Sequence, residues 1–113
     1  MQLQNIFMIM FKILDDLYCN YNQNECLASL LSDMDTSFFD DGKPADAATY
    51  NDWLKIVKPR LHSGTITGSE ILLALIEFLE FYQKEYGYTF QDIIQYLKEH
   101  SKEVIDEAVQ FTI

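Results

Sequence analysis

The stretch that decides the fold is GSEILLALIEFLEFYQKEY, residues 68–86. Thr67 and Glu70 have the spacing of a capping box, in which the threonine hydroxyl accepts the Glu70 amide while the Glu70 side chain reaches back. Gly87 is the kind of residue that ends a helix. Between these signals the stretch is apolar on almost every side, except at Glu77, Glu80 and Lys84. We therefore expect a central helix over about 68–86, contacted on most sides by other helices.

Apolar residues on both sides of this stretch recur at steps of three and four, which is the helical period. The pattern predicts a helix over roughly 3–21, a shorter one around 27–34, and a third whose apolar side includes Trp53, expected in the core. Two more follow, one after residue 89 and one after residue 101. No segment has the period of a strand. The sequence predicts an all-α fold, a compact bundle of five or six helices in a single domain, 1–113.

Polar residues and prolines mark where these helices begin and end. Asp46 is placed to cap the third helix, and Pro59 should end it near Lys58. Thr89 and Asp92 repeat the spacing of the capping box ahead of the fifth helix. Ser101 is placed to cap the last helix.

The charge of the chain restricts its partners. Eighteen acidic and eight basic side chains give a net charge of −10 and a pI near 4.3. Residues 1–54 carry nine acids and only two bases, so the negative charge is concentrated in the first half. Direct binding of nucleic acid or of an anionic membrane requires a positive patch. The composition therefore excludes both as expected partners and favours a cationic one.

The start of the chain, MQLQNIFMIMFKIL, has the apolar character of a secretory signal but not its organisation. It lacks a basic first region, carries Lys12 inside the apolar run and leads into no small-residue cleavage site. The run is also too short to cross a bilayer. Cys19 and Cys26 fit a reducing compartment as free thiols. We expect a cytoplasmic protein.

The residues that catalysis or metal binding would need are few. His62 and His100 are expected in a turn and at a helix end, where the helix dipole explains a histidine. Asp33, Asp35 and Ser37 match the first ligands of a calcium loop. The glycine and glutamate that such a loop requires are replaced by Phe38 and Pro44, so the match fails. We expect that the protein is not an enzyme and that it binds neither a metal nor a cofactor.

The segment DMDTSFFDDGKPAD, residues 33–46, places five carboxylates around two adjacent phenylalanines. Phe38 and Phe39 would be costly to expose in a solvated linker. One of them can instead be buried, which would attach the segment to the core. The aspartates then remain as an acidic rim. An aromatic centre ringed by charge is typical of a protein–protein hot spot, with the charge steering the encounter.

DDGKPADAATYNDWLKIV, followed by GSEILLALIEFLEFYQKEYGYTFQDIIQYL, resembles small acidic helical immunity proteins encoded beside bacterial polymorphic or contact-dependent toxins. The resemblance covers roughly residues 28–97, and its most specific part is KPAD (43–46) leading to Asp52 and Trp53. It implies a protein that binds and neutralises a toxin domain, often a nuclease with a cationic cleft. The partner-binding residues that it implies are Asp33, Asp35, Phe38, Phe39, Asp40, Asp41, Asp46 and Asp52.

Two other functions share this acidic chemistry. One is a regulatory or adaptor module that binds a protein unrelated to toxins. Such a module could also form a homodimer along the first helix, and a molecular mass in solution that depends on protein concentration would reveal it. The other is a nucleic-acid mimic that inhibits a nuclease or repressor, which competition by duplex DNA would reveal.

Overall fold

The computed structural model describes residues 3–35, 46–62 and 65–111, with side chains of the last helix described as far as Glu107. Within these ranges the chain forms six α-helices and one 3-10 turn, and no strand. The elements are α1 (Leu3–Asn20), α2 (Glu25–Met34), α3 (Ala47–Val57), η1 (Lys58–Arg60), α4 (Gly68–Tyr86), α5 (Gln91–Glu99) and α6 (Ser101–Phe111). The expected all-α class is confirmed.

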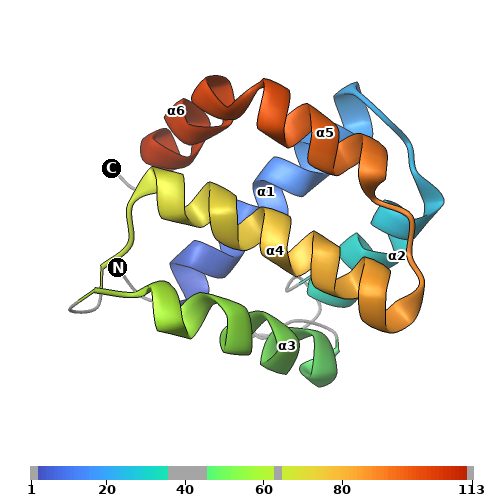
Figure 1. The fold of residues 1–113 in the computed structure, drawn as a ribbon, viewed down its shortest axis with the longest axis horizontal. Coiled ribbons are helices and arrows are strands. Elements are labelled where there is room, and N and C mark those ends of the chain that lie inside the picture. The colour runs from blue at the N-terminus through green and yellow to red at the C-terminus, as the bar shows by residue number, and fades with distance from the viewer. Residues whose placement is uncertain (1–2, 36–45, 63–64, 112–113) are drawn as a thin grey trace.

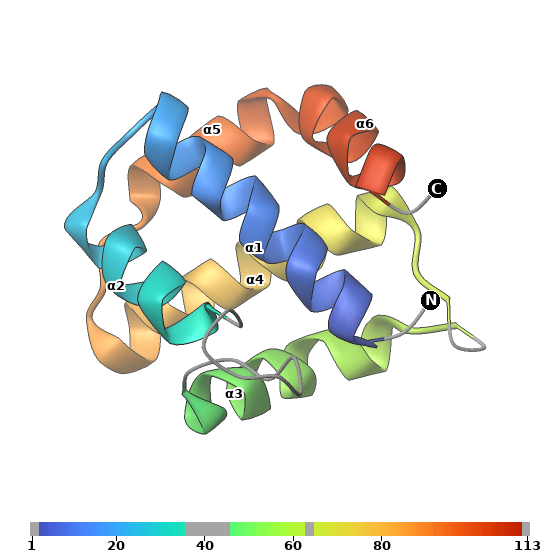
Figure 2. The same ribbon diagram turned by 180° about the vertical axis from the view of Figure 1, so that it is seen from behind.

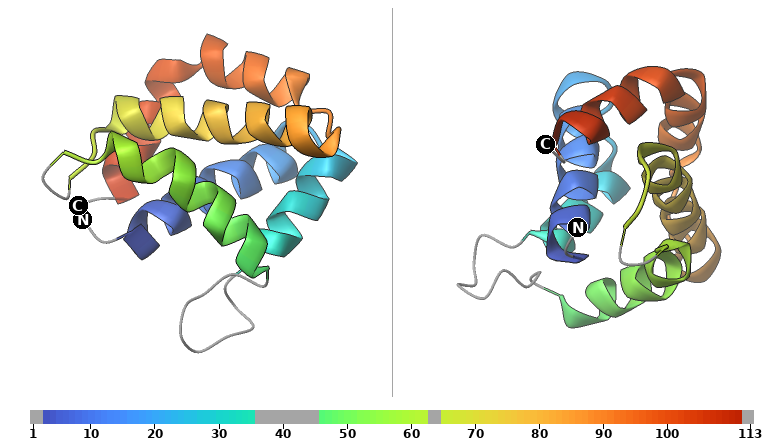
Figure 3. Two further views of the ribbon diagram at one scale, coloured as in Figure 1. Left: turned by 60° about the horizontal axis from the view of Figure 1, so that its bottom comes forward. Right: turned by 90° about the vertical axis from the view of Figure 1, so that its left-hand side faces the viewer.

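The helices are arranged around a core that lies between α1 and α4. Figure 1 shows α4 in front, with α3 below it and α5 and α6 above; Figure 2 shows α1 on the opposite side, with α2 beside it. In the end-on view of Figure 3, α6 closes one side of the space between α1 and α4, and α3 closes the other. Helix α4 contacts α1, α3, α5 and α6. Four of the other five helices therefore pack against α4.

The buried apolar side chains form one continuous cluster. Eight residues of α4 and seven of α1 belong to it, which reflects the dense apolar period of these two helices. One stripe of α4 faces solvent instead: Leu73 is half exposed, and Glu77 and Glu80 lie on the same side. The helix therefore has a solvent-exposed outer face despite its apolar sequence.

Trp53 joins α3 to α1 in this core, as expected from its place on the apolar side of α3. The indole is fully buried, meets the ring of Phe7 edge-on at 5.0 Å and stacks on Tyr50 at 5.5 Å. Its Nε1–H donates to the Met10 sulfur at 2.9 Å, so the one polar atom of the ring has a partner. Trp53 is therefore a core residue, whereas its neighbour Asp52 is only partly buried.

Several of the predicted helix ends are confirmed. The Asp46 carboxylate caps α3 by accepting the amides of Ala48 and Thr49. The Thr67 hydroxyl accepts the Glu70 amide at 3.2 Å and so caps α4. Gly87 ends α4 with a φ of 70°, a left-handed conformation that glycine adopts without strain. These signals are local, so sequence reveals them.

The second half of the predicted capping box at α4 is wrong. The Glu70 carboxylate binds Arg60 instead, with 2.9 Å from Arg60 Nη1 to Glu70 Oε2. Arg60 Nη2 also contacts Glu77 Oε2 at 2.8 Å. One guanidinium thus joins η1 to two turns of α4, and a charged partner from another element outcompetes the local bond.

The expected capping box at Thr89 and Asp92 is also wrong. Helix α5 begins at Gln91, and the residue before it, Phe90, makes no side-chain cap. Phe90 is fully buried, and its amide donates to the Gln83 side chain of α4 at 2.8 Å. Burial of this ring fixes the backbone ahead of α5. Ser101 is likewise the first residue of α6 rather than its cap, because the Val104 amide bonds to the His100 carbonyl.

Candidate functional site

Three of the predicted partner-binding carboxylates lie on one pocket. A hollow of about 230 Å³ is lined by Asp33 at the end of α2, by Asp46, which caps α3, and by Asp52 within α3. The other described lining residues are Ala48, Thr49, Tyr82, Tyr86 and Tyr88. Most of these residues belong to the start of α3 and the end of α4, two segments that lie at the lower right of Figure 1. We call it the acidic pocket.

Backbone contacts hold the ends of α2 and α3 together here. The Asp46 amide donates to the Asp33 carbonyl at 3.1 Å, while the Asp46 side chain caps α3. Met34, next to Asp33, is fully buried and anchors the end of α2 in the core. Residues thirteen positions apart are therefore brought together by the ends of two helices.

The aromatic wall of the pocket comes from the end of α4 and the turn that follows. Tyr82 and Tyr86 lie one helical turn apart with ring centroids 4.8 Å from each other. Gly87 then reverses the chain, which brings the Tyr88 ring to 5.6 Å from that of Tyr82. Three tyrosines thus stand opposite three aspartates.

Hydrogen bonds fix this wall against α3. The Tyr82 hydroxyl donates to Thr49 Oγ1 at 3.2 Å, and both side chains are buried. The Tyr86 hydroxyl donates to Asp52 Oδ2 at 3.0 Å, although Tyr86 itself is half exposed. Tyr82 is the inner support of the pocket, and Tyr86 is its exposed edge.

Burial and negative charge dominate the electrostatics. Burial raises the pKa of the Asp33 carboxyl, and the nearby Asp46 charge raises it further. Burial also raises the pKa of Tyr82 to about 12, against the opposing effect of its bond to Thr49. The bond to Asp52 raises the pKa of Tyr86. Tyr82 and Tyr86 therefore stay neutral, and the described lining of the pocket contains no basic side chain.

Carboxylates beside aromatic faces form a binding environment for a cation. The carboxylates attract a Lys or Arg side chain and accept its hydrogen bonds. An aromatic face adds a cation–π contribution of about 0.5–2 kcal/mol, depending on how far the site is desolvated. The arrangement of the described lining residues suits a basic side chain.

The remaining predicted partner-binding residues lie elsewhere. Asp35 is the half-buried residue directly after α2 and does not line the acidic pocket. Phe38, Phe39, Asp40 and Asp41 lie outside the described residues. The structure thus brings together Asp33, Asp46 and Asp52, which are nineteen residues apart in sequence at most.

Sequence reasoning missed Tyr82, Tyr86 and Tyr88. A signal was present, since Tyr82 and Tyr86 share a helix face and Gly87 predicts a reversal beside Tyr88. Their proximity to the aspartates depends on how α4 packs against α3, for which the sequence carries no signal.

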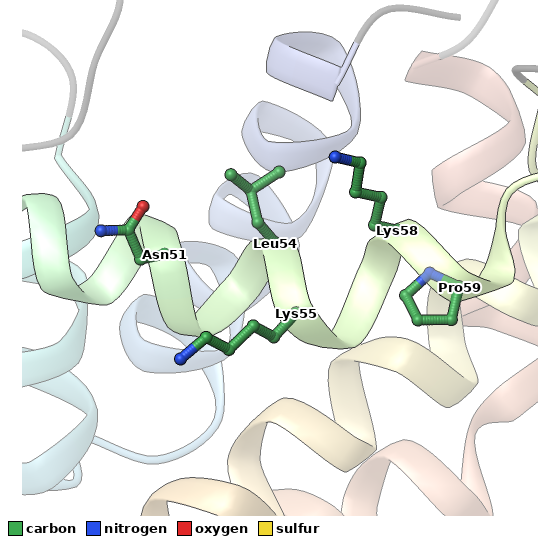
Figure 4. A pocket seen from close by; sticks show the side chains of 5 residues that line it. All are labelled: Asn51, Leu54, Lys55, Lys58 and Pro59. Atoms are coloured by element: carbon green, nitrogen blue, oxygen red, sulfur yellow. The ribbon is translucent and has the colours of Figure 1, made fainter.

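Helix α3 presents opposite charges along its length. Asp46 lies at its start, whereas Lys55 and Lys58 lie at its end, on the rim of an open hollow of about 670 Å³ that Figure 4 shows. This hollow is lined by Asn51, Leu54, Lys55, Lys58 and Pro59, all of α3 and η1. Acids at the start and bases at the end complement the helix dipole, which explains this distribution without a ligand.

Among the described residues, no group of three or more His, Cys, Asp or Glu side chains is placed to hold a metal ion. Cys19 and Cys26 are free thiols. In the part of the chain that the structure describes, no helix combines the length and apolar character needed to span a membrane. No family model, curated protein or solved structure matches the chain.

Proposed function

We propose that this protein is a non-catalytic immunity protein that binds and neutralises a cationic bacterial toxin domain in the cytoplasm. The observation that supports this most directly is the acidic pocket, where Asp33, Asp46 and Asp52 meet the three tyrosines. The proposal also draws on the sequence resemblance described above and on the net charge of −10.

Binding would proceed in two stages. The negative field of the chain speeds the encounter with a cationic surface, an effect that salt weakens. A Lys or Arg side chain of the toxin then enters the acidic pocket, where Asp46 and Asp52 supply charge and Tyr86 supplies an exposed aromatic face. Removal of one partner from a buried, paired contact of this kind costs about 2–5 kcal/mol, whereas an exposed rim charge contributes far less.

A toxin of the nuclease type fits this mechanism best. Such an enzyme must present Lys and Arg to the phosphate backbone, and an acidic protein competes for the same residues. Inhibition then needs only occupation of the cationic surface, so the immunity protein needs no chemistry, metal or cofactor of its own. One copy of this chain for each toxin domain suffices.

A growth assay tests the function. The C-terminal domain encoded by the gene directly upstream is induced in cells with and without this protein. Relief of toxicity by this protein alone supports the proposal. A harmless domain, or one that is toxic regardless of this protein, removes the main support for immunity and favours the adaptor function.

A binding assay then tests the pocket. Asp33→Asn with Asp52→Asn removes two charges from the pocket and leaves the Asp46 cap in place. Glu99→Gln with Asp106→Asn removes two charges from exposed positions of α5 and α6 and serves as the matched control. We expect the first pair to weaken toxin binding at least tenfold and the control pair to change it less than twofold. Equal effects would show that only net charge matters.

A further inference from the structure

A second cavity, of about 260 Å³, lies between α1 and α6, away from the acidic pocket. Asp16 and Tyr21 line it from α1 and the turn that follows, Tyr96 from α5, and Glu103 and Glu107 from α6. We call it the α1–α6 cavity. Figure 2 shows α1 in front, with α6 at its upper right; the two helices are in contact.

Asp16 of α1 and Glu107 of α6 line this cavity together, and a side-chain hydrogen bond with Asp16 is one cause of the raised pKa of Glu107. Two ionised carboxylates have only acceptors, so a bond between them requires that one carries a proton. Burial, the bond to Asp16 and the Asp16 charge, in that order, raise the pKa of Glu107 to about 7.

The described residues that line the cavity offer no positive charge to replace this proton. Glu103 on α6 adds a third carboxyl, and Tyr96 on α5 is stacked on His100 with ring centroids 4.0 Å apart. Lys12, one turn earlier on α1, lines a different hollow. No described residue of α4 lines the cavity, and none of its described lining residues is basic.

We propose that a proton shared between Asp16 and Glu107 holds α6 on α1, so that the contact strengthens in acid and weakens in base. When the proton leaves, two like charges face each other across the helix interface. Since α6 is also packed against α4 and α5, we expect it to open more often rather than to detach permanently.

The sign follows from the two protonation states. In the docked state Glu107 keeps its proton up to a pH of about 7, whereas an exposed glutamate releases its proton near pH 4.5. The docked state therefore binds more protons between these values, and docking weakens as the pH rises through this window. One pH unit of difference corresponds to a factor of ten. Because Glu107 is partly exposed, solvent screens the effect. We therefore expect the equilibrium constant for opening of α6 to change roughly tenfold in total.

Hydrogen exchange of the α6 amides on the full chain measures this opening. After correction for the intrinsic exchange rate, the wild-type opening constant should be about tenfold higher at pH 8.5 than at pH 5.5. In Glu107→Gln, the amide group can donate to the Asp16 carboxylate and does not titrate, so opening should be the same at both values. Asp106→Asn, an exposed change on the same helix, should retain the wild-type dependence.

Two further measurements keep the proposal open to refutation. The carboxyl carbon of Glu107, followed by NMR in the wild type, should titrate with a midpoint near 7, and a midpoint near 4.5 would overturn the proposal. His100 lies at the junction of α5 and α6, and histidine titrates in the same range. If His100→Gln abolishes the pH dependence while Glu107→Gln retains it, the histidine is the switch and the proposal is wrong.

Discussion

The acidic pocket and the α1–α6 cavity are built from the same residue types and hold their charge differently. Both combine three carboxyl groups with tyrosine rings. In the acidic pocket Asp46 accepts backbone amides of α3 and Asp52 accepts the Tyr86 hydroxyl, so these two charges have donors. In the α1–α6 cavity Glu107 lies beside Asp16, which raises the pKa of Glu107. Donors favour the charged form of a carboxylate, whereas a bond between two carboxyls requires that one of them keeps a proton.

This difference suggests different roles for the two regions. Carboxylates that stay ionised beside aromatic faces can attract a cationic partner at neutral pH. A pair that exchanges a proton near neutral pH instead makes a helix contact depend on pH. Four changes test the comparison, and they follow in order of decreasing effect.

Tyr82→Ala should have the largest effect, because Tyr82 is 4% exposed and supports the whole aromatic wall. Loss of a buried aromatic ring lowers the free energy of unfolding by about 3–5 kcal/mol. Tyr21→Ala, in the α1–α6 cavity, removes a ring that is 49% exposed and should cost about 1 kcal/mol. Urea denaturation measures both. Equal losses of stability in the two variants would contradict the expected difference between the buried Tyr82 ring and the exposed Tyr21 ring.

Asp46→Ala should lower the free energy of unfolding by about 1–2 kcal/mol, because it removes the cap of α3. Asp46→Asn retains a capping oxygen and should change stability by only a few tenths of a kcal/mol. The pair separates the capping function of Asp46 from its charge. If Asp46→Asn destabilises as much as Asp46→Ala does, the charge rather than the cap stabilises this end of α3.

Glu107→Gln should increase the free energy of unfolding relative to wild type at pH 8, by about 1 kcal/mol after allowance for solvent screening. The wild type loses stability as the pH rises from about 4.5 to about 7, since its folded state keeps a proton that the unfolded state releases. The gain should disappear at pH 4, where the glutamate is protonated in both states. Denaturation at the two pH values checks this, and an equal gain at both would contradict the shared proton.

Asp52→Asn should have the smallest effect, a fall in the pKa of Tyr86 toward the ordinary value for tyrosine. The bond to the Asp52 carboxylate is the main cause of the raised pKa of Tyr86, and a carboxamide removes its charge. Tyr82 should keep a pKa of about 12, because burial is the main cause there. NMR titration of ring-labelled tyrosine measures both groups, and a parallel fall of the two would refute this assignment of causes.

The helix ends show how far sequence-based prediction reaches. Thr67 and Thr89 stand in the same pattern, each three residues before an acidic residue. The hydroxyl of Thr67 caps a helix, whereas Thr89 uses its carbonyl to accept the Asn24 side chain of α2 at 2.7 Å. The two sites differ in a tertiary contact, the burial of Phe90. A capping pattern thus identifies where a helix can begin, and packing decides whether it does.

The candidate site was predictable in part for the same reason. Asp33 and Asp46 stood out because their segment is rich in charge, and Asp52 because it lies within the resemblance. That these three surround a single pocket depends on the packing of α2, α3 and α4. Tyr82 and Tyr86 had the spacing of a shared helix face, but an aromatic face on a helix is more often buried than part of a site.

The sequence by itself determined the all-α class, the extents of α1 and α4, the caps at Asp46 and Thr67, and the acidic charge. Each of these depends on residues within a few turns of one another, where the helical period and capping chemistry act. Only the tertiary structure decided that three aspartates would meet three tyrosines and that Asp16 and Glu107 would line one cavity. Such contacts join residues far apart along the chain, and their energies depend on burial and on neighbours that no local pattern specifies.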